Sequence, residues 1–188
     1  MINADDFYGR SAYERLARHL RVSEASQTLN FALVGYCLRE TLSAAGGVSR
    51  AICDVDTGSL LLNLNEFHEL QMAGGIISGR SAASGKPQTF HGNEPVSMNF
   101  WGFTPDVFPI LAAAFDRFRQ DAGSSAAAEF LIGAAAQQMV ESGAARIKVL
   151  PGGLGWLGIT YPGDREPTGQ ALADMVRNGQ YPSPLLPG

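Results

Sequence analysis

Two adjacent carboxylates near the start of the chain are the residues best suited to chemistry. Asp5 and Asp6 follow a short apolar lead, Met1-Ile2, and precede Phe7-Tyr8-Gly9. This pattern is typical of a β-strand that delivers acidic side chains to a loop. In open α/β sheets, ligands bind beyond the carboxyl ends of the strands. The pair is therefore a candidate set of metal ligands for a phosphate-bearing substrate, although the residues alone favour a solvated turn at the strand end for Asp5 and a turn or a helix cap for Asp6.

Composition limits the class of protein. The chain has 188 residues, and its hydrophobic fraction of 45% is enough for one domain with a substantial core. Its net charge of -4 gives no electrostatic basis for binding nucleic acid or an anionic membrane. No apolar run reaches the roughly 18 residues of a membrane span, and the first residues lack the pattern of a signal peptide, so a cytoplasmic protein is expected. Cys37 and Cys53 have no CxxC spacing and are expected to be buried free thiols.

Helix and strand signals alternate along the chain, which predicts an α/β fold with a mixed, mostly parallel sheet. Ser11 and Glu14 have capping-box spacing and predict a helix over 11–20. Further helices are expected from Thr104-Pro105 onward and over 129–142 and 170–177. Apolar runs predict strands at 28–36, 48–55, 60–62, 96–103, 145–150 and 155–161.

The glycine-rich stretch 71–93 is expected to be an exposed loop that contains one short strand at 76–77. In the helix after Pro105, we expect an inner face made of Phe108, Leu111, Ala112, Phe115 and Phe118. Residues 181–188 are rich in proline and are expected to form an extended tail.

A series of segments, in order along nearly the whole chain, resembles the sugar-phosphate nucleotidyltransferase family. The segments are 2–9 (INADDFYG), 33–36 (LVGY), 47–50 (GVSR) with 52–56 (ICDVD), 96–103 (VSMNFWGF), 128–131 (AEFL), 148–151 (KVLP) and 156–161 (WLGITY). The resemblance implies a nucleotide-diphospho-sugar transferase fold, a Rossmann-like α/β sandwich that is incomplete at its N-terminus. It also implies a reaction in which a nucleoside triphosphate and a sugar 1-phosphate give a nucleotide-sugar and pyrophosphate with Mg²⁺.

The resemblance also suggests roles for individual residues. Asp5 would be the Mg²⁺-binding aspartate and Asp6 its neighbour, while Glu66, Asn99 and Glu129 would contact the sugar. The residues alone leave other interpretations open. Asn99 also fits a buried amide satisfied by backbone, Glu129 also fits the first turn of a helix, and Glu66 also fits an exposed loop.

The sequence departs from the family at the groups that hold phosphate. The glycine-rich G-x-G-x-R loop that binds the triphosphate does not occur, and Gly158 stands where better-known relatives have a second metal-binding aspartate. We therefore expect residues 1–180 to be the C-terminal part of a nucleotidyltransferase domain, in a truncated or split form that needs an N-terminal-half protein. The alternatives are a non-catalytic remnant that binds a sugar phosphate or a protein partner, and a misplaced start of the reading frame.

Overall fold

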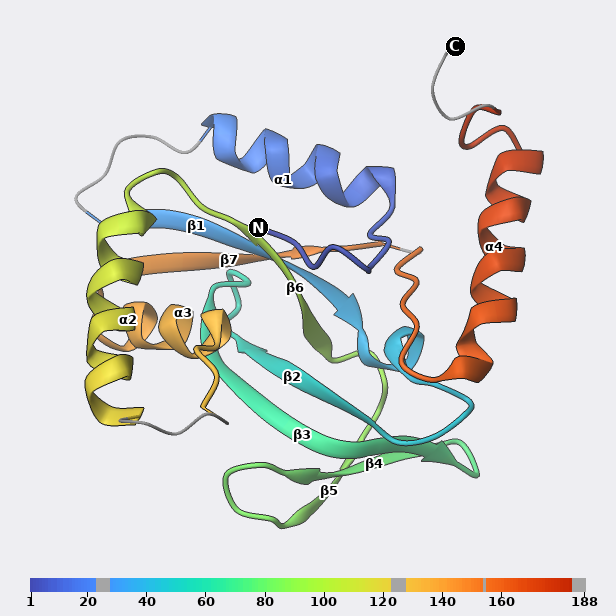
Figure 1. Cartoon of the computed structure of the whole chain (residues 1–188), viewed down its shortest axis with the longest axis horizontal. Helices are drawn as coiled ribbons and strands as arrows, with labels where there is room; N and C mark the ends of the chain where they lie inside the picture. Colours follow the sequence, from blue (N-terminus) through green and yellow to red (C-terminus); the bar gives the residue numbers. More distant parts are fainter. Residues whose placement is uncertain (23–27, 123–127, 154, 184–188) are drawn as a thin grey trace.

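Within residues 1–22, 28–122, 128–153 and 155–183, which the computed structural model describes, seven strands form one sheet (Figure 1). The strands are β1 (Leu29–Cys37), β2 (Val48–Val55), β3 (Leu61–Ala73), β4 (Ile76–Ser81), β5 (Pro87–Phe90), β6 (Pro95–Gly102) and β7 (Ala145–Pro151). The helices are α1 (Arg10–Val22), α2 (Val107–Ala122), α3 (Ile132–Glu141) and α4 (Arg165–Arg177), with short 3-10 turns η1 (Leu38–Thr41) and η2 (Pro162–Asp164).

The sheet is mixed, in the order β5-β4-β3-β2-β6-β1-β7. This confirms the α/β class and the mixed sheet, but the expectation that most strands are parallel is wrong. In the described part of the chain only β1 and β7 run parallel, and every other neighbouring pair is antiparallel. The reason is the short connections from β2 to β5. Gly74 and Gly75, both with positive φ, join β3 to β4, and a two-residue turn can only join antiparallel strands.

The middle of the sheet is buried on both faces. On β1, Ala32, Val34 and Tyr36 pack in the cluster that includes α1, whereas Phe31 and Leu33 pack in the cluster that includes α2 and α3. This division follows from the alternation of side chains along a strand. It places α1 on one face of the sheet and α2 with α3 on the other (Figure 1).

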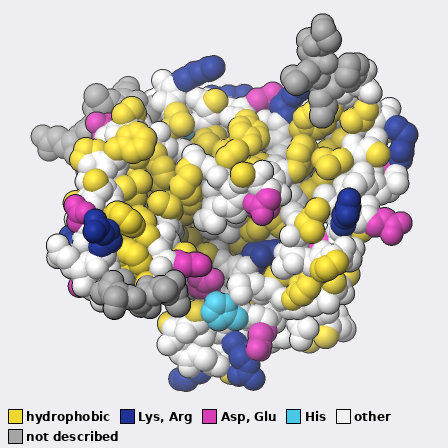
Figure 2. All heavy atoms as spheres, in the orientation of Figure 1, with side chains coloured by type: hydrophobic (Ala, Val, Ile, Leu, Met, Phe, Trp, Pro, Cys, Tyr) yellow, Lys and Arg dark blue, Asp and Glu magenta, His cyan; other side chains and the backbone are white. Residues whose placement is uncertain are grey.

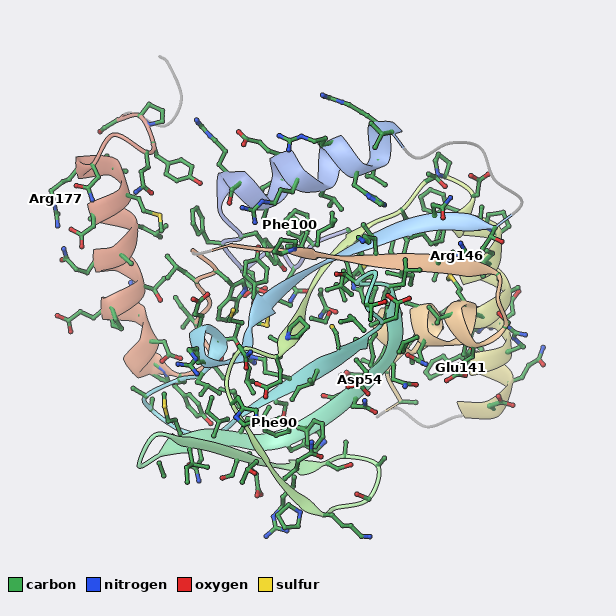
Figure 3. The ribbon with its side chains drawn as sticks, turned by 180° about the vertical axis from the view of Figure 1, so that it is seen from behind. Asp54, Phe90, Phe100, Glu141, Arg146 and Arg177 are labelled. Atoms are coloured by element: carbon green, nitrogen blue, oxygen red, sulfur yellow. The ribbon has the colours of Figure 1, made fainter. Side chains whose placement is uncertain are left out.

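Helix α1 confirms the expected helix over 11–20 and packs closely on β6. A Cβ atom added at Gly102 would lie 2.4 Å from Leu16 Cδ1, so the missing side chain allows this approach. Phe100 of β6 lies under α1 (Figure 3), and its ring centroid is 4.7 Å from those of Tyr8 and Tyr13. These contacts fix the first residues of the chain beside β6.

Several local expectations are wrong. Residues 71–93 are mostly strand rather than loop, because β3, β4 and β5 form successive hairpins there. Residues 155–161 form no named strand and contribute one isolated bridge, Phe7 with Leu157. The apolar lead to Asp5 is not a strand either, although the Met1 backbone bonds to Trp101 on β6.

The orientation of α2 also differs from the expectation. Phe108 and Phe115 are 69% and 43% exposed, while Val107 and Ala114 are buried, so the apolar stripe is rotated from the predicted one. Figure 2 shows the resulting hydrophobic side chains on the surface over α2 and α3. Cys53 is buried as expected but Cys37 is exposed, and both are free thiols. Most of the predicted tail lies outside the described residues.

None of the helices in the described ranges combines the length and the apolar character that crossing a membrane requires.

Candidate functional site

A cleft of about 790 Å³ opens where the N-terminal residues, β2, β3, β6 and α3 meet. Its walls combine backbone and polar side chains from parts of the chain that are far apart in the sequence. The polar lining residues are Asn3, Ser49, Arg50, Glu66, Ser97, Asn99, Gln137 and Gln138. The cleft therefore offers both hydrogen-bond donors and acceptors to a guest.

Asn99 reaches the cleft because β6 bulges at this residue. Between the Leu33–Trp101 and Gly35–Ser97 pairs, β1 advances by two residues and β6 by four. Asn99 has a φ of 58°, a left-handed conformation that asparagine tolerates better than most residues. Its neighbours Met98 and Phe100 are buried, whereas its own side chain is exposed. The alternative of a buried amide is therefore wrong.

Glu66 faces the same cleft from β3. It pairs with Ala51 of β2, and its side chain is exposed, so the alternative of a loop position is wrong. Gln137 of α3 closes this wall, because its Oε1 accepts from the Leu64 backbone N–H at 2.9 Å. Two of the sugar-contacting residues implied by the resemblance, Glu66 and Asn99, thus lie on one cavity.

Glu129 lies elsewhere. It precedes α3, which begins at Ile132, so it is not in the first turn of that helix. It lines an adjoining cavity of about 720 Å³ with Arg117 and Asp121 of α2, and it is not among the lining residues of the cleft. The structure therefore does not place Glu129 with Glu66 and Asn99.

Tyr8 links Asp6 to the bulge in β6. Its hydroxyl lies 2.7 Å from the carbonyl oxygen of Met98 and 3.2 Å from Asp6 Oδ2. The same Asp6 oxygen accepts from Asn3 Nδ2 at 2.9 Å. Burial, and then the nearby Asp6 carboxylate, raise the pKa of the Tyr8 phenol, so it stays a neutral donor. Asp6 is thus bonded to Asn3, which lines the cleft, but neither Asp6 nor the exposed Asp5 is itself a lining residue of the cleft or of the other cavities.

The position expected to hold a second metal-binding aspartate has no room for one. A Cβ atom at Gly158 would lie 2.4 Å from Cζ2 of the Trp156 ring and 2.9 Å from Asp6 Oδ1. No group of three histidine, cysteine or acidic side chains that could hold a metal occurs in the described ranges. No contact among the described residues brings the carboxylates of Asp5 and Asp6 together, because Asp6 Oδ2 accepts from Asn3 and Tyr8 and Asp5 is exposed.

Arg50 is the residue that sequence reasoning missed. It sits inside β2 and lines both the cleft and a neighbouring cavity of about 280 Å³. Its Nε and Nη2 donate to the Thr41 carbonyl oxygen at 3.1 and 2.5 Å, and its guanidinium lies 5.4 Å from the ring centroid of Trp156. The available signal was a cation within the apolar run from Val48 to Val55, but its partners are remote in sequence.

Two carboxylates lie near Arg50 without forming an ion pair with it. Burial lowers the pKa of its guanidinium, and the charges of Asp6 and Asp164 oppose that shift. Asp164 accepts from Ser43 Oγ at 2.7 Å and from the Tyr161 N–H at 2.8 Å, and these bonds lower the pKa of its carboxyl. The ion pairs found among described residues, Arg80–Glu69 and Arg177–Asp174, do not include Arg50.

Comparison with known proteins gives no family assignment. No protein-family model matches the chain, and no curated protein matches it.

Proposed function

We propose that the cleft binds a sugar phosphate, and that the chain is the sugar-phosphate-binding part of a nucleotidyltransferase with a Rossmann-like architecture. The observation that carries the proposal is the convergence of Glu66 and Asn99 on one cleft. A carboxylate accepts hydrogen bonds and an amide both donates and accepts, which suits the hydroxyl groups of a sugar. The left-handed conformation of Asn99 supports the same proposal, because such strain is concentrated at ligand sites.

In this proposal Mg²⁺ is held by Asp5 and Asp6. When bound, the ion would neutralise charge on the phosphates of the substrates. Asn3 and Tyr8 hold Asp6 by hydrogen bonds to one carboxylate oxygen, so they orient the side chain and leave Oδ1 for other partners.

The residues of the cleft account for binding of a sugar phosphate but not for its reaction with a nucleoside triphosphate. No G-x-G-x-R element occurs in the sequence, so in this proposal the groups that hold the triphosphate lie outside these 188 residues. The second candidate is a non-catalytic protein that binds a sugar phosphate or a protein partner, and the same missing element favours it. In the first candidate the cleft binds a sugar phosphate. In the second it binds a sugar phosphate or a protein partner, and no reaction follows.

Isothermal titration of the purified chain with glucose 1-phosphate and other sugar 1-phosphates tests the proposal. We expect binding, and we expect Glu66→Gln and Asn99→Gly to weaken it by about tenfold or more, since each removes a hydrogen bond to the ligand. Glu166→Gln, on the exposed side of α4, serves as the control. Equal affinity in both cleft variants and the wild type would refute the proposal.

Pyrophosphate release measured with each nucleoside triphosphate, a sugar 1-phosphate and Mg²⁺ distinguishes the two candidates. We expect no release from the chain alone. Release that appears when a separate triphosphate-binding polypeptide is added supports the enzyme, and release by the chain alone that is lost in Asp5→Ala would contradict the need for a second polypeptide.

A further inference from the structure

We propose that Arg50 binds the phosphate group of the ligand, in an anion subsite between the cleft and the neighbouring small cavity, both of which it lines. The inference rests on the proposed function and deepens it, because it assigns the charged part of the ligand to a residue. The residues after Glu66 on β3 are Phe67-His68-Glu69, so this part of the strand brings no arginine or lysine to the cleft. A phosphate in the cleft therefore needs a cation from elsewhere.

The hydrogen bonds of Arg50 leave the end of its guanidinium available. The group carries five N–H donors. Nε and Nη2 donate to the Thr41 carbonyl oxygen, and Nη1 donates to the Ser49 carbonyl oxygen at 2.8 Å. One N–H on each terminal nitrogen thus has no acceptor among the described residues. Two such donors match two oxygens of a phosphate monoester.

The surroundings hold this group in place before a ligand arrives. The Thr41 carbonyl oxygen fixes one edge of the guanidinium, and the Trp156 ring lies against its face. The indole Nε1–H of Trp156 is enclosed and has no acceptor within the described part of the chain. The small cavity therefore has in its wall a cation that forms no ion pair with any described residue, and an oxyanion could pair with it.

The two nearby carboxylates, Asp6 and Asp164, form no ion pair with Arg50 among the described residues. Asp164 is surrounded by donors from Ser43, Thr160 and Tyr161, and Asp6 Oδ2 accepts from neutral donors. Neither carboxylate lies within the 4.0 Å of an ion pair with Arg50. Their charges oppose any anion at Arg50, so we expect glucose 1-phosphate, which also gains contacts in the cleft, to bind more tightly than inorganic phosphate.

Titration calorimetry with inorganic phosphate, glucose 1-phosphate and glucose tests the subsite in low-salt buffer with EDTA. We expect Arg50→Gln to weaken the binding of both phosphate compounds by about tenfold or more. Arg50→Lys should weaken their binding less, because lysine keeps the positive charge but loses the paired N–H donors of the guanidinium. Arg146→Gln, on the exposed side of β7 (Figure 3), is the matched control and should bind as the wild type does.

A second measurement uses the wild-type chain and does not depend on a variant that folds. Phenylglyoxal modifies accessible arginines, and peptide mass spectrometry locates the modified residue. Saturating inorganic phosphate should protect Arg50 and leave Arg146 reactive. Equal modification of Arg50 with and without phosphate would overturn the subsite.

The outcomes separate the two proposals. Glucose 1-phosphate that binds Arg50→Gln as tightly as the wild type overturns the subsite and leaves the proposed function standing. Inorganic phosphate that binds through Arg50 while glucose 1-phosphate does not bind supports the subsite and overturns the proposed function. If neither compound binds the wild type at about 10 mM, a concentration that detects even weak sites, both are overturned.

Discussion

Asn99 allows the fold and the proposed site to be tested separately. Its φ of 58° is unfavourable for any side chain with a Cβ atom and is free for glycine. Its side-chain amide makes no hydrogen bond within the described part of the chain, and it is exposed to the cleft. Asn99→Gly should therefore remove the amide from the cleft without removing a contact that holds the fold.

The expected change in stability follows from two opposing terms. Glycine relieves strain of up to about 1 kcal/mol at this φ, because asparagine already tolerates it better than other residues. Glycine also increases the freedom of the unfolded chain, which costs about 0.4–1 kcal/mol. The two terms nearly cancel, so Asn99→Gly should stay within about 1 kcal/mol of the wild type.

Asn99→Val is the contrasting variant. A β-branched side chain cannot adopt this φ without strain, which costs about 1–3 kcal/mol. For a chain of this size that corresponds to a melting temperature lower by about 3–10 °C. Thermal unfolding followed by circular dichroism measures both variants. A Val variant as stable as the wild type, or a Gly variant much less stable, would refute the bulge and its left-handed residue.

Three further predictions concern the surroundings of the cleft. Gly158→Ala should destabilise the chain by about 1–3 kcal/mol in urea titrations, because the added Cβ would meet the ring of Trp156; an unchanged unfolding midpoint would contradict that packing. Hydrogen bonds from Ser43 and then from the Tyr161 N–H lower the pKa of Asp164, so its carboxylate stabilises the fold above its ordinary value of 3.8, and this contribution is lost as the pH falls through the lowered pKa. Asp164→Asn should therefore lower the free energy of unfolding at pH 7, and its difference from the wild type should shrink as the pH falls below the pKa of Asp164. A difference that does not change with pH would argue against this role of the Asp164 hydrogen bonds. Burial raises the pKa of the Cys53 thiol to about 12 and Cys37 is exposed, so a thiol reagent should label Cys37 in the native chain and both residues only in denaturant.

The sequence predicted what depends on local pattern. The apolar run of β1 and the helix α1 are found close to where their residues indicate, because both signals are local. Ser11 is not the helix cap, however, since α1 begins at Arg10. The pairing of strands was not predictable in the same way, since the antiparallel contacts of β6 with β1 and β2 join distant segments. The hairpins at 71–93 were missed because Gly74 and Gly75 dominate a stretch whose strands are largely exposed.

The candidate site shows the same limit. Asn99 stood out in the sequence as a polar residue in an apolar strand, but only the register between β1 and β6 shows that a bulge turns it toward the cleft. Arg50 gave a weaker signal. Its importance depends on Thr41 and Trp156, one from η1 and the other from the segment after β7, which meet it only in the folded chain.

A crystal structure of the chain soaked with glucose 1-phosphate tests the central claim most directly. The account predicts a sugar ring in the cleft within hydrogen-bonding distance of Glu66 and Asn99, with its phosphate on the terminal nitrogens of Arg50. A ligand bound at another surface with this cleft empty would contradict it.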